Sequence, residues 1–183
     1  MELSEAIDKR KSIRKYQNKK INKNIIESLI DSARLAPSAK NRQPWSFVVV
    51  QDIIKNKIAD TMIKKENELL QTTDRKGSSV INTAKIIKEA PILIIVLKEY
   101  DENWIISDCL SIGAAIEHIC LKATDLGLGS LWIADTVYVQ KDIAKLVEHE
   151  NMQVISAISI GYSDQEPNRR PRKKLEDILE WYN

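Results

Sequence analysis

Two clusters of basic side chains, far apart in the sequence, have the composition of an anion-binding site. Residues 9–23 contain eight basic residues and no acidic one, and the spacing Arg10-x-Ser12-x-Arg14 lies within them. The second cluster, residues 168–174, runs Asn-Arg-Arg-Pro-Arg-Lys-Lys. Guanidinium groups pair with phosphate oxygens through two parallel hydrogen bonds, and a hydroxyl adds a short one. The clusters are compatible with a site for one phosphate group, with a solvated basic surface or with a nucleic-acid contact.

A short polar turn is the third stretch with chemical potential. Residues 37–47 run Pro-Ser-Ala-Lys-Asn-Arg-Gln-Pro-Trp-Ser-Phe, between a helical pattern and an apolar run. Pro37 and Pro44 each fix φ and lack an N–H, so the turn joins neither neighbouring element. Its free amides and polar side chains could face a ligand, although an ordinary helix-to-strand connector has the same pattern.

Apolar periodicity predicts the elements that position these residues. Residues 66–82 show no clear period and are compatible with a surface loop or with a lid over a substrate pocket. Asn22 and Asp52 are candidate helix caps, and Gly127 is placed to end the longest helix. The pattern predicts helices at 2–11, 22–36, 54–62, 104–126 and 142–147, and strands at 45–51, 92–97, 130–133 and 154–160.

The predicted helix at 104–126 is more apolar than a helix with one buried face needs to be. Its polar residues form one narrow stripe, and apolar residues occupy much of the remaining surface, so we expect it to be buried on two sides. Cys109 and Cys120 would lie about 16 Å apart along this helix, too far for a disulfide. They are expected to be two reduced core thiols.

Composition and charge exclude several classes of protein. The 183 residues predict one domain spanning 1–183, and 43% apolar with 30% charged residues is typical of a globular protein. A net charge of +2 does not favour general affinity for nucleic acid or membranes. We find no apolar run near 20 residues and no signal-peptide layout, and we expect a cytoplasmic protein. His118 and His149 lack metal-ligand spacing, so no metal is expected.

Four segments, in order along the chain, resemble the FMN-dependent nitroreductase family. They are Arg10-x-Ser12-x-Arg14, the turn at 37–47, the segment Leu-Gly-Leu-Gly-Ser-Leu-Trp-Ile at 126–133, and Arg-Pro-Arg at 170–172. The last follows Gly161-Tyr162-Ser163, where the family has proline in place of the serine. The resemblance covers nearly the whole chain.

The resemblance implies an α+β, three-layer (α/β/α) fold with a central, mostly antiparallel sheet flanked by helices. It also implies an intertwined homodimer built around the long helix, with an amphipathic tail at 175–181 reaching across the partner. The activity implied is ping-pong hydride transfer from NADH or NADPH through FMN to a small-molecule acceptor such as a nitroaromatic or quinone. A flavin storage or sensor protein without turnover, and a related enzyme that fragments flavin or removes halide, stay as alternatives.

The site residues that the resemblance implies fall into three groups. Basic residues and a serine would hold the FMN phosphate, with Arg14 at the pyrimidine edge of the flavin. The turn at 37–41 would approach the flavin from the second subunit, and a backbone N–H of Ala134 or Asp135 would point at flavin N5. No side chain has a dedicated catalytic role, and Asn82 and Lys85 loosely resemble a further flavin-contacting pair. The implied cofactor-binding residues are Arg10, Lys11, Ser12, Arg14, Pro37, Ser38, Ala39, Asn41, Trp132, Ile133, Ala134, Asp135, Arg170 and Arg172.

Overall fold

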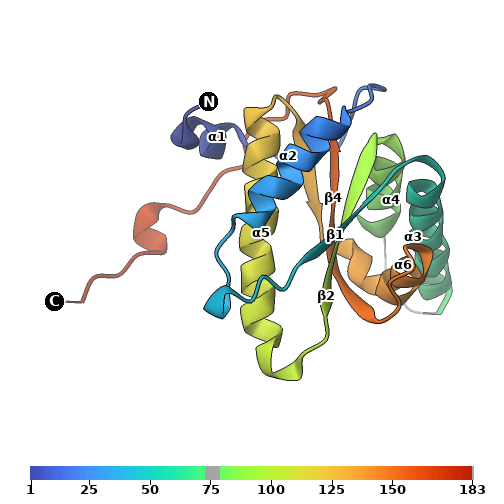
Figure 1. Ribbon diagram of the computed structural model, residues 1–183. Coiled ribbons are helices and arrows are strands. Elements are labelled where there is room, and N and C mark those ends of the chain that lie inside the picture. The colour runs from blue at the N-terminus through green and yellow to red at the C-terminus, as the bar shows by residue number, and fades with distance from the viewer. Residues whose placement is uncertain (73–78, 183) are drawn as a thin grey trace.

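A four-stranded antiparallel sheet forms the centre of the molecule (Figure 1). The computed structural model describes residues 1–72 and 79–182. The strands lie in the order β1-β2-β4-β3 and comprise β1 (Ser46–Val50), β2 (Ile92–Glu99), β3 (Gly129–Ile133) and β4 (Met152–Gly161). Every residue of β2 except the last is buried, because the strand lies inside the sheet with both faces covered. This explains the unbroken apolar run at 92–97.

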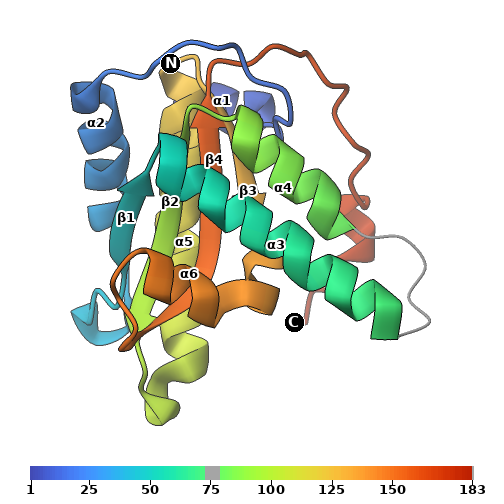
Figure 2. The same ribbon diagram turned by 90° about the vertical axis from the view of Figure 1, so that its right-hand side faces the viewer.

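Helices cover both faces of the sheet, which confirms the predicted three-layer fold. Helices α2 (Lys23–Arg34) and α5 (Ile105–Asp125) lie on one face, and α3 (Asp52–Thr72), α4 (Ser79–Glu89) and α6 (Gln140–Leu146) lie on the other (Figures 1 and 2). The short helix α1 (Leu3–Lys9) contacts α5. Alternate side chains of β2 enter the two cores, since successive strand residues point to opposite faces.

The helices differ from the sequence predictions at several places, and one of these is α4, which is not among the predicted helices. Helix α3 continues to Thr72 and so includes residues 66–72 of the stretch at 66–82 that shows no clear apolar period. It packs along α4, and this tertiary contact stabilises it in place of a strong local signal. The tip of the predicted loop, residues 73–78, lies outside the described residues. Asp52 is the first residue of α3 rather than its cap, and Asn22 precedes α2 without a capping side-chain hydrogen bond.

Helix α5 ends as predicted but is buried on only one side of this chain. Gly127 adopts φ +71°, its N–H bonds to the carbonyl of Thr124, and the following N–H bonds to the carbonyl of Ala123. On the side away from the sheet, Ile106 is 75% and Leu110 is 71% exposed. The same side carries Cys109, which is therefore an exposed free thiol and not the core thiol predicted; Cys120 is buried as expected.

By length and composition, the segment Glu102–Asp125 could cross a membrane. This departs from the expectation that no apolar segment approached that length. In the fold the segment packs lengthwise against the sheet and α2, and its apolar residues fill the core on that face. Packing in the core accounts for the buried side of the segment, while Ile106 and Leu110 stay exposed on the other side.

Candidate functional site

The first basic segment is bound to the edge of the sheet by backbone hydrogen bonds. The N–H of Ile13 donates to the carbonyl of Ser130 in β3 at 2.9 Å, and the N–H of Gln17 donates to the carbonyl of Tyr162 at 2.9 Å. The buried hydroxyl of Tyr16 donates to the carbonyls of Ile13 and Ser159. Burial raises the pKa of Tyr16, so this hydroxyl stays a donor at neutral pH. These bonds anchor the backbone at Ile13 and Gln17, and they thereby fix the positions of Arg10, Ser12 and Arg14 along the same segment.

Two paired glycines allow this close approach. Gly129 and Gly161 lie opposite each other in β3 and β4. A Cβ on Gly129 would lie 2.6 Å from Cγ1 of Ile13, and one on Gly161 would lie 2.7 Å from Cδ1 of Tyr16. Within the segment at 126–133, Gly127 ends helix α5, while Gly129 makes room for the basic segment.

The structure brings the two basic clusters together around one small cavity. The cavity has a volume of about 230 Å³ and joins residues 10–14 to residues 167–172, roughly 155 positions later in the chain. Among the described residues, no acidic side chain lines it. Its walls are formed by Arg10, Lys11, Ser12, Arg14, Pro167, Asn168, Arg169, Arg170 and Arg172.

Most of these cations are not neutralised within the protein. Nε of Arg10 lies 3.3 Å from a carboxylate oxygen of Glu117, and Arg169 pairs with Asp8 at 3.0 Å. Among the residues that the structure describes, Arg14, Arg170 and Arg172 form no ion pair with a carboxylate; Arg14 and Arg172 each donate to a nearby backbone carbonyl. The cavity, referred to below as the cationic pocket, is therefore prepared for an external anion.

A second cavity, of about 480 Å³, adjoins the first through Arg14. It lies between α4 and the end of β3, and it includes Trp132, whose side chain is 46% exposed. The side chain of Ile133 is buried in the core, so chiefly its backbone is available to a ligand. The walls of this cavity, called the ring pocket below, are Arg14, Ser79, Asn82, Thr83, Ile86, Leu131, Trp132, Ile133, Ala134 and Asp135.

Hydrogen bonds fix the floor of the ring pocket. The hydroxyl of Thr83 donates to Oδ2 of Asp135 at 2.6 Å, tying α4 to the residues after β3. The hydroxyl of Ser156 donates to the carbonyl of Ile133 at 2.7 Å. Asn82, which the sequence indicated, lines the pocket, and Lys85 does not. The sequence did not indicate Thr83, whose one signal is its place beside Asn82.

The turn at 37–41 lies elsewhere in this chain. None of Pro37, Ser38, Ala39 and Asn41 lines either pocket. The N–H of Ala39 instead donates to Oγ of Ser111, in the half of α5 that carries the exposed Leu110. Ten of the fourteen sequence-predicted site residues therefore line the two adjoining pockets of one chain. The other four lie beside an exposed apolar surface.

The buried thiol near the pockets is not an activated nucleophile. Burial raises the pKa of the nearby Cys120 to about 11, so its thiol is protonated at neutral pH. In residues 1–72 and 79–182, no group of three or more His, Cys, Asp and Glu side chains is arranged to hold a metal.

A sequence model of the nitroreductase family matches residues 7–162. The chain belongs to the nitroreductase family. A protein of Archaeoglobus fulgidus, provisionally named NADH dehydrogenase/NAD(P)H nitroreductase, is 33% identical over 86% of this chain and 83% of its own. A BluB-like flavoprotein of Clostridium difficile has a solved structure that superposes with a TM-score of 0.85, at 28% identity and full coverage of both chains.

The chain is also similar to a protein with a different name. The iodotyrosine deiodinase of Hydra vulgaris is 26% identical over 95% of this chain and 70% of its own. The family match begins just before the first basic cluster and stops before the second, so Arg170 and Arg172 lie beyond it. The structure, rather than the family match, places these two arginines at the cationic pocket.

Proposed function

We propose that this chain is an FMN-dependent oxidoreductase that uses NADH or NADPH as its electron donor. The observation that carries the proposal is the junction of the cationic pocket and the ring pocket at Arg14. FMN combines one phosphate dianion with a flat ring system that has an apolar dimethylbenzene end and a polar pyrimidine end. A small cavity rich in unpaired cations next to a larger one with both apolar and polar walls fits both parts of that molecule.

The residues present suit the roles that the proposal gives them. Arg10, Ser12, Arg170 and Arg172 would bind the phosphate with charged hydrogen bonds, and Lys11 would add charge. Arg14, shared by both pockets, would lie near the ring and favour negative charge on it. When bound, FMN would supply the hydride chemistry, accepting from the nicotinamide and passing electrons to an acceptor.

Backbone groups at the end of β3 complete the proposed ring site. The bond from Ser156 holds the carbonyl of Ile133, and the bond from Thr83 holds the side chain of Asp135. The N–H groups of Ala134 and Asp135 lie between these two anchors. A fixed N–H directed at the place where charge develops stabilises that charge without reorganisation.

The proposal includes a homodimer in which each active site is shared. Ile106 and Leu110 on α5 form an exposed apolar surface, and the C-terminal segment leaves the body of the chain with exposed Leu175 and Trp181 (Figure 1). Exposed apolar surfaces of this kind mark protein contacts. The turn at 37–41 lies beside α5, so dimerisation through α5 would carry it to the site of the second copy.

The test is the visible absorption spectrum of the purified protein, followed by anaerobic addition of NADH and then of NADPH. We expect a flavin spectrum that bleaches with at least one donor. Retained flavin that neither donor reduces would instead support a storage or sensor protein. A protein that is colourless and takes up no added FMN would overturn the proposal. The shared site would be contradicted by full activity in a dilute sample shown to be monomeric.

Halide removal is the second candidate activity, favoured by the similarity to the Hydra deiodinase. Both activities use a reduced flavin, so the donor assay does not separate them. Incubating the reduced protein with a nitroaromatic, a quinone and 3-iodotyrosine in parallel does so. Faster reoxidation by the nitroaromatic or quinone is expected; release of iodide as the fastest reaction would replace them as the acceptor class.

A further inference from the structure

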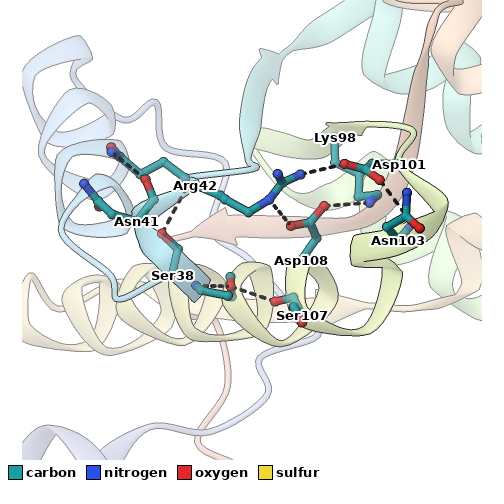
Figure 3. Close-up of polar contacts among 11 residues, drawn as sticks. Ser38, Asn41, Arg42, Lys98, Asp101, Asn103, Ser107 and Asp108 are labelled. Carbon is teal, nitrogen blue, oxygen red and sulfur yellow. Dashed lines mark hydrogen bonds and ion pairs between the residues drawn. The ribbon is translucent and has the colours of Figure 1, made fainter.

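A network of charged side chains lies where the turn at 37–44 meets α5 (Figure 3). Lys98 and Asp108 are each only 1% exposed, and Nζ of Lys98 lies 3.0 Å from Oδ2 of Asp108. Arg42 extends this pair: its Nη2 lies 2.9 Å from Oδ2 of Asp101 and its Nε lies 3.4 Å from Oδ1 of Asp108. Removing two charges from water is costly, so a buried ion pair is better explained by a requirement for one specific arrangement than by stability alone.

The turn that Arg42 belongs to has an unfavourable backbone. Lys40, Asn41 and Gln43 have φ angles of 50°, 56° and 49°, in the left-handed region that residues with a Cβ seldom adopt. A segment with three such residues keeps its conformation only when surrounding contacts determine it. Among the described residues, one hydrogen bond within the turn joins a backbone N–H to a side chain. The N–H of Gln43 donates to Oγ of Ser38 at 3.0 Å.

Beyond the hydrogen bonds within the turn itself, its contacts come from residues 101–111, at and just before the start of α5. The guanidinium carbon of Arg42 lies 4.3 Å from the centre of the Trp104 ring, and Nζ of Lys40 lies 5.3 Å from it. The N–H of Ala39 donates to Oγ of Ser111 at 3.2 Å. Asp101, Trp104 and Asp108 all lie within eight positions of one another, so a single short stretch of chain carries most of these contacts.

We infer that Arg42 and Asp108 are positioning residues that hold the turn at 37–41 in its left-handed conformation and so shape the part of the cofactor site that the turn supplies. The role in holding the turn is independent of the proposed function, whereas the effect on the cofactor site rests on it. The network lies outside both pockets, so neither residue touches the cofactor held by its own chain. Asp108 acts through Arg42, and Arg42 acts through the backbone of its own turn.

Arg42→Met is the variant that separates positioning from stability. Arg42 is one-third exposed, and its removal leaves the buried pair of Lys98 and Asp108 intact, so the variant should fold. Arg34→Met is the matched control, because Arg34 also pairs with an aspartate, at 2.8 Å, but on an exposed surface of α2. Arg42→Lys keeps the charge but lacks the planar group that spans two carboxylates.

Hydrogen exchange of the purified protein, saturated with FMN where it binds FMN, gives the first measurement. In Arg42→Met we expect the amides of Ala39 and Gln43 to exchange about tenfold faster, with the thermal midpoint within about 2 °C of wild type. The FMN dissociation constant should rise about three- to tenfold, because the turn would no longer be held in the position from which it contacts the cofactor. Arg42→Lys should recover part of both effects, and Arg34→Met should change neither.

The outcomes separate this inference from the proposed function. Unchanged exchange of the turn in Arg42→Met would overturn the positioning role, whether or not FMN binds. Faster exchange with an unchanged FMN dissociation constant would overturn the link to the cofactor. If wild type binds no FMN, the proposed function fails and exchange alone decides whether the network holds the turn. Asp108→Asn should give the same local exchange pattern with a lower thermal midpoint.

Discussion

The cationic pocket and the network at the turn both collect arginines from distant segments, yet they differ in what neutralises the charge. In the network, Arg42 has two carboxylate partners, and the buried Lys98 has one. In the cationic pocket, Arg170 and Arg172 have no carboxylate partner among the described residues, and both are exposed. The first arrangement is complete within the chain, while the second leaves its charges available to an anion from outside.

This difference shows how residues of one type take on opposite tasks. A paired, buried charge fixes the position of the backbone that carries it, because any displacement would leave a partner uncompensated. An exposed and unpaired arginine costs little in the free protein and keeps its hydrogen-bonding capacity for a ligand. Burial and partner, which the sequence alone does not display, decide between the two.

The strongest test of the contrast is the stability of Asp108→Ala. The substitution leaves the ammonium of Lys98 buried without a partner, so the free energy of unfolding should fall by about 3–5 kcal/mol. Urea denaturation measures this loss. Asp31→Ala is the control, because it removes an exposed ion pair with Arg34 and should cost about 0.5 kcal/mol or less. A loss below about 1 kcal/mol for Asp108→Ala would mean that the network is not completed within the chain.

Arg172→Ala should have the reverse profile, because it would remove a charged hydrogen bond to the ligand, whereas within the protein it removes a long, exposed bond to the carbonyl of Arg170, at 3.4 Å. We expect FMN affinity to weaken by about 1.5–3 kcal/mol, with unfolding in the absence of FMN unchanged within about 0.5 kcal/mol. Quenching of flavin fluorescence during titration gives the affinity. An unaltered FMN dissociation constant would remove Arg172 from the proposed phosphate site.

Salt should distinguish the two regions by a smaller amount. The screening length falls from about 10 Å at 0.1 M to about 3 Å at 1 M, and this affects exposed charges far more than buried ones. FMN affinity should therefore fall about three- to tenfold over this range, whereas the stability lost in Asp108→Ala should change by less than about 0.5 kcal/mol. Equal salt sensitivity of the two measurements would contradict the assigned difference in exposure.

Arg169→Ala is expected to have the smallest effect and sharpens the comparison within the cationic pocket. Arg169 lines the same cavity as Arg172 but already pairs with Asp8 at 3.0 Å. Its removal should change FMN affinity by less than about threefold, about 0.6 kcal/mol. A loss as large as that for Arg172→Ala would show that internal pairing does not decide which arginines serve the ligand.

Local patterns in the sequence were sufficient for most of the fold. The buried strand β2, the end of α5 at Gly127 and the alternation of helices and strands each follow from signals within about 20 residues. Helix α3 beyond residue 62 was missed, because packing along α4 stabilises it in place of a clear apolar period. Cys109 was wrongly assigned to the core, because the sequence shows that a helix is apolar on two sides but not that one side is left open by its own chain.

For the candidate site, the sequence by itself determined the residue types: two basic clusters, a polar turn with two prolines, and a glycine-containing segment before a strand. The tertiary structure alone decided that the two basic clusters meet around one cavity, that Gly129 makes room for Ile13, and that Arg42 is neutralised while Arg172 is not. The physical reason is range. Helix and strand periods are properties of neighbouring residues, whereas the pairing of a charge depends on which distant segment the fold places within about 4 Å of it.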